Sequence, residues 1–393
     1  MKKVVLLIHR GYPLGGNAGD KVRTLNMAVS LQRLGYNVIL LGFFTKRFSL
    51  LRKEKKMIPD GIKAFFIYSL PNRGGLAKIA ALLRAITTYL ICKYYSVDII
   101  QAELSSSATA ARFVPQIPLV TDFHSDIVPE LEMDNYSKSV VRHAAWENKY
   151  ALTRSDKIIA VSENLYHNLG EYGIIPSESH ILPCNFDAEP FLKIDQNTRC
   201  ILQEKYGLTE KIILCYSGGL HTWQCIRETL EIVIRLRKLN TAYYFCLFTN
   251  DSIEPYIDLL NQLENAYMVK GLQREDIPAY LSMIDVGFVL RANSLVNINA
   301  SPTKASEYMA AGAMVIATRY AGDVPQQIQK SGCGIILNEL YIDDDCLESI
   351  NKRIIEYNRH YNELSKRAKE YVHANRTWNS NEDKLSCLYK DLI

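Results

Sequence analysis

The 393-residue sequence has no run of 18 uninterrupted apolar residues, the length that a membrane-spanning helix needs. Its nine cysteines are scattered, with no C-x-x-C pair, so we expect neither a disulfide framework nor a structural zinc site. The pattern G-x-G-x-x-G is also missing, which argues against a dinucleotide dehydrogenase. The net charge of +4 is too small to indicate a nucleic-acid partner. Scattered cysteines without a disulfide pattern favour a cytoplasmic location.

Hydrophobic residues make up 48% of the chain and charged residues 22%, as is typical of globular proteins. This length predicts two domains of about 150–200 residues. The apolar run at residues 4–8 is too short for a signal-peptide core. We therefore expect residues 3–9 to form a first buried strand.

Short apolar runs alternate with helical patterns in both halves of the chain. A strand, a loop, a helix and a second strand in succession build parallel sheets, because parallel neighbours need a crossover connection. Predicted strands lie at residues 3–9, 38–44, 64–68, 97–101, 118–122 and 157–162, then at 212–216, 244–249, 266–270, 285–290 and 314–318. Polar residues and a proline place a linker near residues 187–197. The predicted fold class is α/β, with two Rossmann-like, doubly wound domains.

A helix predicted to start near residue 302 carries the most informative candidate site. Ser301 is expected to cap the helix and Pro302 to occupy its first position. The free amides there can bind an anion, and Lys304 places a cation against the helix dipole, which suggests an anion close by. Glu307 lies about 7.5 Å further along, so a diphosphate at the helix start and a ribose diol at Glu307 fit the spacing. An exposed Lys304–Glu307 ion pair is an equally good interpretation.

Two further candidates follow predicted strands. Gly15 and Gly16 could let a substrate approach the backbone, or form a plain turn. His124 could hydrogen-bond a substrate hydroxyl or transfer a proton, although a lone histidine at a strand end is more often a polar loop residue. Asp122, His124 and Asp126 suggest a metal site, but a fourth ligand is missing nearby, so we expect no metal.

Residues 301–318, leading into 321–325, resemble the donor-site segment E-A-x-A-x-G-x-P-V-I-A-T … G-G-x-P-E of a known family. This family is the retaining nucleotide-sugar glycosyltransferases of family four, which have the GT-B fold. Weaker matches, spread over nearly the full length, are Gly15-Gly16, residues 121–124, 156–163, 181–187 and 271–285, and Trp378.

The resemblance implies two Rossmann-like domains that face each other across a cleft. Residues 1–190 would bind the acceptor, residues 198–372 the nucleotide sugar, and residues 373–393 would form a helix that returns to the first domain. Glu307 matches the glutamate that binds ribose hydroxyls, and His124 matches the histidine that reaches the donor sugar. The predicted catalytic residues are His124, Asn299 and Glu307, and the predicted donor-binding residues are Gly15, Gly16, Gly218, Gly219, Arg291, Ser301, Pro302, Thr303, Lys304 and Glu307.

Three positions depart from the family pattern. The first of two family glutamates falls on Asn299, which can bind a hydroxyl but cannot act as a carboxylate. The family's diphosphate-binding arginine and lysine fall on Gly219 and Gln224. Losing those cations would remove stabilisation of the leaving diphosphate on the order of several kcal/mol. Arg291 and Lys304 flank the same region, so we expect them to replace the missing cations.

The predicted reaction moves a sugar from a UDP- or GDP-linked donor to a hydroxyl of a glycan or lipid-linked acceptor, with retention and without cofactor or metal. Such a reaction would serve bacterial surface polysaccharide or glycoconjugate synthesis. Two alternatives stay open: a nucleotide-sugar 2-epimerase of the same fold, and a non-catalytic partner subunit that has lost the diphosphate cations.

Residues 76–95 are rich in apolar side chains and include Lys78, Arg84 and Lys93. A basic cluster at residues 46–56 precedes them. Apolar surface beside basic charge is what a peripheral contact with the anionic inner face of a membrane needs. The alternative is a core helix that covers the sheet, next to a solvated basic loop.

Overall fold

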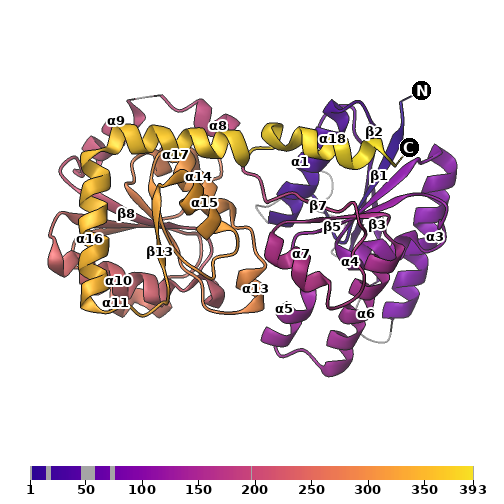
Figure 1. The fold of residues 1–393 in the computed structure, drawn as a ribbon, viewed down its shortest axis with the longest axis horizontal. Coiled ribbons are helices and arrows are strands. Elements are labelled where there is room, and N and C mark those ends of the chain that lie inside the picture. The colour runs from indigo at the N-terminus through magenta and orange to yellow at the C-terminus, as the bar shows by residue number, and fades with distance from the viewer. Residues whose placement is uncertain (1, 15–18, 46–57, 71–75, 196, 393) are drawn as a thin grey trace. The chain divides into compact units, whose positions relative to one another are not determined.

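The computed structural model describes residues 2–14, 19–45, 58–70, 76–195 and 197–392. The chain divides into two compact units, one of Met1–Cys184 with Asn381–Ile393 and one of Asn185–Ser380. Each unit is a parallel sheet packed with helices (Figure 1), so the predicted α/β class with two Rossmann-like domains is confirmed. Within the described residues, no helix combines the length and the apolar character needed to span a bilayer.

The first unit is built on a seven-stranded sheet in the order β3-β2-β1-β4-β5-β6-β7, with every neighbouring pair parallel. Its strands are β1 (Val4–His9), β2 (Asn37–Phe44), β3 (Lys63–Tyr68), β4 (Ile99–Glu103), β5 (Leu119–Phe123), β6 (Lys157–Ala160) and β7 (His180–Ile181). Its helices include α1 (Gly19–Arg33), α3 (Ala77–Tyr95), α4 (Leu104–Ala108), α5 (Ile127–Met133), α6 (Lys138–Arg154), α7 (Glu163–Leu169) and α18 (Glu382–Lys390). From β1 the chain builds outward first through β2 and then, on the other side, through β4. The junction of β1 and β4 is therefore the switch point, where open α/β sheets bind ligands.

The second unit repeats this plan with six parallel strands in the order β10-β9-β8-β11-β12-β13. The strands are β8 (Ile212–Ser217), β9 (Tyr243–Phe248), β10 (Tyr267–Lys270), β11 (Val286–Val289), β12 (Met314–Thr318) and β13 (Gly334–Leu337). The helices include α8 (Glu189–Leu192), α9 (Thr198–Lys205), α10 (Ile226–Leu239), α11 (Ile257–Asn261), α12 (Ile277–Ser282), α13 (Leu295–Ile298), α14 (Thr303–Ala311), α15 (Val324–Ser331), α16 (Asp344–Arg359) and α17 (Tyr361–Asn375). Its switch point lies between β8 and β11.

The boundary between the units lies before the linker that the sequence predicts. Phe186 is buried in the core of the second unit and its backbone pairs with that of Thr377. The predicted linker at residues 187–197 therefore falls inside the second unit, and its proline lies in the first turn of the short helix α8. Because Phe186 is buried in the core of the second unit, the polar residues that follow it belong to that unit and do not form a linker.

The end of the chain belongs to the first unit. In α18, Tyr389 donates a hydrogen bond from its hydroxyl to Gln101 on β4. Just beyond the helix, Asp391 lies 3.8 Å from the Lys157 ammonium on β6. These contacts hold residues 381–392 against the first sheet, whereas residues 373–380 belong to the second unit. The cleft expected between the two domains stays a prediction.

Candidate functional site

Several predicted donor-binding residues meet at the switch point of the second unit. Gly218 and Gly219 follow β8, Arg291 follows β11 by two residues, and Lys304 stands in the first turn of α14. Because β8 and β11 are neighbours, their carboxyl ends bring these loops together. The sheet order thus joins residues that lie more than 80 positions apart in the sequence.

The Lys304 ammonium reaches the position where the resemblance places the missing family lysine. It donates hydrogen bonds to the Tyr216 hydroxyl at 2.7 Å and to Gln224 Oε1 at 3.0 Å. Gly218 makes room for it: with a φ of +129°, a Cβ added there would lie 2.6 Å from the Lys304 Nζ. The Tyr216 hydroxyl in turn donates to the Gly219 carbonyl at 2.5 Å. Lys304 therefore places its ammonium beside Gln224, one of the two positions where the family cations are missing.

Arg291 adds a second cation close to Lys304. It is 5% exposed, and its guanidinium donates to the Leu290 carbonyl at 2.9 Å. Its backbone is held by Thr318, whose hydroxyl accepts from the Arg291 N–H at 2.9 Å and donates to the Arg291 carbonyl at 2.7 Å. Burial lowers the pKa of Arg291, although neighbouring Tyr216 and other groups oppose the shift.

These two cations lack a carboxylate at ion-pair distance among the residues that the structure describes. Burial lowers the pKa of Lys304 well below its usual value, and the charge of Arg291 lowers it further against the opposing effect of Glu307. Placing a half-buried lysine beside a buried arginine is unfavourable unless an anion compensates the two charges. The arrangement is therefore suited to binding an anion.

Glu307 lies one turn beyond Lys304 on α14 and is half-buried. Its carboxylate forms no hydrogen bond or ion pair with any described residue, so the exposed Lys304–Glu307 ion pair does not form. Burial raises the pKa of Glu307, while Lys304 and Arg274 act in the opposite direction. A carboxylate without a hydrogen-bond partner among the described residues can accept hydrogen bonds from two hydroxyls of a ligand.

The start of α14 differs from its prediction. The helix begins at Thr303, and Pro302 occupies the capping position without a side-chain cap. The hydroxyl of Ser301 instead donates to Asp323 at 2.7 Å and accepts from Arg376 at 2.9 Å. Arg376 also pairs directly with Asp323. The Ser301 hydroxyl, which was expected to cap the helix, is therefore bound by the buried Arg376–Asp323 ion pair. Ser301 thus attaches the start of the segment 301–318 to that pair.

Asn299, one of the predicted catalytic residues, lies in the turn that follows α13. It is buried and stands two residues before Ser301 in the same segment. Gly15 and Gly16 lie outside the described residues.

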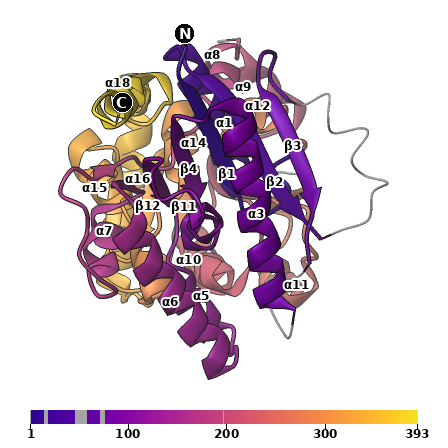
Figure 2. The ribbon, with the colours of Figure 1, turned by 90° about the vertical axis from the view of Figure 1, so that its right-hand side faces the viewer.

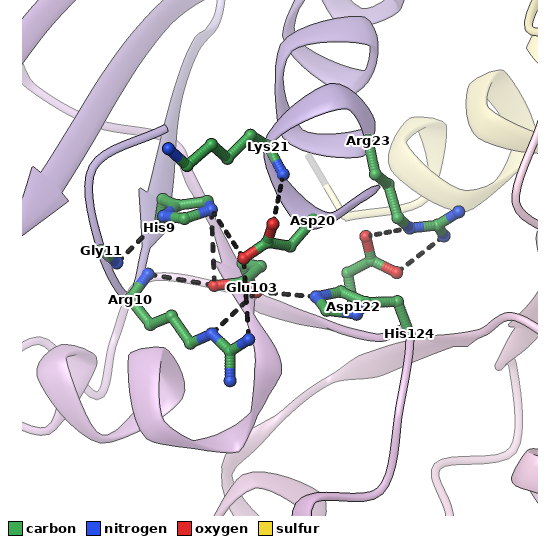
Figure 3. A network of polar contacts seen from close by, with 9 residues as sticks. All are labelled: His9, Arg10, Gly11, Asp20, Lys21, Arg23, Glu103, Asp122 and His124. Atoms are coloured by element: carbon green, nitrogen blue, oxygen red, sulfur yellow. Dashed lines mark hydrogen bonds and ion pairs between the residues drawn. The ribbon is translucent and has the colours of Figure 1, made fainter. Parts of the chain in front are cut away.

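In the first unit, His124 is bound to a residue that sequence reasoning missed. Its Nε2 donates to Glu103 Oε1 at 2.7 Å (Figure 3). Glu103 ends β4 and also accepts from the Arg10 N–H at 3.0 Å. Burial alone would raise the pKa of Glu103, but His9, His124 and Arg10 outweigh it and hold the pKa below its usual range. Glu103 is thus an ionised, buried carboxylate that orients His124.

Asp122, His124 and Asp126 do not converge as the metal interpretation would require. Asp122 forms a buried bidentate pair with Arg23, with both contacts at 2.8 Å. Asp126 caps α5 through the Val128 N–H and accepts from Asn148 and Tyr172. Each acidic group is held by its own partners.

Besides Glu103, sequence reasoning missed His9 and Asp20. All three lie at or near the carboxyl ends of β1 and β4, which can be recognised once the sheet order is known. His9 ends β1, Glu103 ends β4, and Asp20 lies in the first turn of α1, the helix that follows β1. Leu104, directly after Glu103, has a φ of 60°, a conformation that side chains rarely adopt. The carboxyl ends of β1 and β4 form the switch point of the first sheet, but their adjacency cannot be read from the chain order.

Two family models match the chain in tandem. Residues 19–189 match "Glycosyltransferase Family 4", and residues 200–371 match "Glycosyl transferases group 1". The sequence has no significant match among curated proteins.

Solved structures with similar folds match over nearly the whole chain. Sucrose-phosphate synthase from Thermosynechococcus elongatus is 17% identical with a TM-score of 0.77, covering 100% of this chain and 99% of its own. A glycosyltransferase from Rickettsia africae is 18% identical with a TM-score of 0.74, covering 100% and 98%. HepE from Anabaena, in complex with UDP and glucose, is 16% identical with a TM-score of 0.73, covering 99% and 100%. With its two parallel-sheet units and both family models, the chain is a glycosyltransferase with the GT-B fold.

Proposed function

We propose that this glycosyltransferase uses a UDP-linked sugar and transfers the glycosyl group, with retention, to a hydroxyl of a glycan or lipid-linked acceptor. The observation that carries the proposal is the pair of cations, Arg291 and Lys304, at the switch point of the second sheet without an acidic partner among the described residues. Glu307 supplies a carboxylate for the ribose diol. A similar structure, HepE, is described in complex with UDP-glucose, which favours UDP over GDP here.

In this proposal Lys304 and Arg291 stabilise the negative charge that develops on the departing diphosphate. Such fixed groups act most strongly in a site that excludes water. Retention follows if the acceptor hydroxyl attacks from the face on which the diphosphate leaves and passes its proton to that diphosphate. His124 has Nε2 engaged by Glu103, so its Nδ1 is the nitrogen available to a sugar hydroxyl.

A panel of UDP- and GDP-sugars tests the proposal and separates its alternatives. We expect UDP to be released from one UDP-sugar, and proton NMR to show that the product keeps the anomeric configuration of the donor. An isomerised nucleotide sugar without a transfer product would instead identify a 2-epimerase. Binding of none of the nucleotides would identify a non-catalytic subunit and contradict the proposal.

We also propose that α3 contacts an anionic membrane surface. One side of α3 packs into the first unit through Ala80, Ala85 and Cys92. The other side carries a continuous apolar face, each member of which is between 36% and 81% exposed: Leu76, Ile79, Leu82, Leu83, Ile86, Tyr89, Leu90 and Tyr94. Figure 2 shows this helix on the side of the first unit that faces the viewer.

The charges along α3 are only partly those expected from the sequence. Lys78 and Lys93 are exposed beside the apolar face, where they can meet lipid phosphates. Arg84 is buried and donates to the Ser69 hydroxyl at 2.8 Å, so it adds no surface charge. The basic cluster at residues 46–56 lies outside the described residues. The core-helix and membrane interpretations are therefore compatible, because each uses a different side of α3.

Replacing Leu83 and Leu90 together by serine should weaken binding to anionic vesicles at least tenfold, because burying a leucine contributes about 1.5–3 kcal/mol. Sedimentation with anionic and neutral vesicles, at low and high salt, measures the change. Leu239→Ser, at an exposed leucine of the second unit, is the matched control and should bind like the unchanged protein. Equal, negligible binding of the unchanged protein to both kinds of vesicle would contradict membrane contact and favour an acceptor in solution.

A further inference from the structure

A second polar cluster occupies the switch point of the first sheet, next to the His124–Glu103 pair. It consists of His9 at the end of β1, Glu103 at the end of β4 and Asp20 at the start of α1 (Figure 3). One ligand atom from each lies within 4.8 Å of the others. The side chains of His9 and Glu103 are 2% and 4% exposed, whereas that of Asp20 is 21% exposed and marks the open side.

The backbone fixes which nitrogen of His9 carries the proton. The Gly11 N–H donates to His9 Nδ1 at 2.9 Å, so Nδ1 presents its lone pair. Burial lowers the pKa of His9 against the opposing charges of Glu103 and Asp20, which favours the neutral ring. A neutral ring that accepts at Nδ1 must carry its proton on Nε2.

That Nε2–H group is buried and has no hydrogen-bond partner among the described residues. It faces Asp20 Oδ2 at 3.9 Å and Glu103 Oε2 at 4.0 Å, both too far for a direct hydrogen bond. A buried donor left unsatisfied costs free energy, so a group that fills the gap is favoured. The gap suits an oxygen atom that bridges donor and acceptors.

The chemistry of the three groups selects among possible occupants. A metal ion would need a lone pair on Nε2, which His9 could provide only by giving up its bond from Gly11. An anion would be repelled by two carboxylates. A further cation is disfavoured because the Arg10 guanidinium already lies 3.6 Å from Asp20. A hydroxyl fits the donor and one acceptor, because it accepts from Nε2–H and donates its single proton to either Asp20 or Glu103.

We propose that His9, Asp20 and Glu103 form a subsite that binds a hydroxyl group of the carbohydrate acceptor. The carbohydrate nature of the ligand rests on the proposed function. Glu103 serves both ends of the arrangement, since Oε1 accepts from His124 and Oε2 faces the subsite. The bound hydroxyl thus lies beside the histidine that resembles the family's donor-sugar contact.

The probe is methyl α-D-glucopyranoside, a soluble sugar that carries several hydroxyls and no charge. With the full chain labelled with ¹⁵N at histidine, and His9 assigned from His9→Gln, titration should shift the His9 Nε2 signal. Asp20→Asn and Glu103→Gln should each weaken this response at least tenfold. Asp20 is partly exposed, so its variant keeps the test valid if Glu103→Gln fails to fold. Asp134→Asn, at an exposed acidic residue of the same unit, should respond like the unchanged protein.

Two results would overturn the subsite. The first is the absence of any His9 response to the sugar at concentrations up to several hundred millimolar. The second is a response of His9 to Zn²⁺ or Mn²⁺ but not to the sugar, which would identify a metal site. Binding of UDP, measured separately by calorimetry, reports on the second unit. If His9 responds to the sugar but UDP does not bind, the proposed donor is wrong and the subsite stands. If UDP binds but His9 does not respond to the sugar, the subsite is wrong and the proposed donor stands.

Discussion

Lys304→Gln should lower turnover of the UDP-sugar by about 100- to 1,000-fold, the usual effect of removing one fixed donor from a developing negative charge. The free energy of unfolding should not fall, because the ammonium is desolvated and lies near Arg291 without an acidic partner among the described residues. Steady-state kinetics and urea unfolding measure the two quantities on the same preparation. Lys330→Gln, at an exposed lysine of α15, is the matched control and should change neither.

Moving the cation provides a sharper control. The Lys304 ammonium lies 3.0 Å from Gln224 Oε1, so a lysine at residue 224 can place its charge in nearly the same position. The double variant Lys304→Gln/Gln224→Lys should recover at least tenfold of the activity that Lys304→Gln loses. If Lys304→Gln is fully active, or if the relocated charge restores nothing, Lys304 does not act as the diphosphate cation.

Glu307→Gln should weaken the binding of uridine, UMP and UDP alike, by about 10- to 100-fold, because hydrogen bonds to a charged group contribute about 1.5–3 kcal/mol. The loss is equal across the three because all of them carry the ribose diol. Calorimetry measures the affinities, with Glu356→Gln at an exposed position of α16 as the matched control. Unchanged affinity in Glu307→Gln would remove the ribose assignment.

The same carboxylate predicts a dependence on pH. Since burial raises the pKa of Glu307, its charged form is lost at a higher pH than that of an ordinary glutamate. Uridine binding, which involves no titrating phosphate, should therefore weaken as the pH falls through this raised pKa. Glu307→Gln should lack this dependence.

The sequence predicts the fold well because both the strands and the helices show their own hydrophobic patterns within short stretches of sequence. Apolar runs mark the buried strands, and helical spacing of apolar residues marks the helices. The helix at 226–239 and the strand at 314–318 are predicted with the bounds that the structure shows. The relative position of Lys304 and Glu307 can also be predicted from the sequence, because the two residues lie one turn apart on the same helix. What the sequence could not supply is the contact of Lys304 with Gln224, which depends on the neighbouring positions of β8 and β11.

The polar cluster of the first unit was missed for a related reason. His9, Asp20 and Glu103 come from separate elements, and none of them carries a motif. Only the neighbouring positions of β1 and β4 bring them within reach of one another. The expected cap at Ser301 failed differently, because a long-range ion pair, Arg376–Asp323, competes for its hydroxyl.

The most direct measurement of the proposed donor site is the affinity of the unchanged protein and of Lys304→Gln for uridine, UMP and UDP by calorimetry. If Arg291 and Lys304 hold a diphosphate, UDP should bind the unchanged protein at least 100-fold more tightly than uridine, and Lys304→Gln should lose most of this difference while keeping its affinity for uridine. Equal affinities for UDP and uridine in the unchanged protein would show that these cations do not bind the diphosphate of a sugar donor.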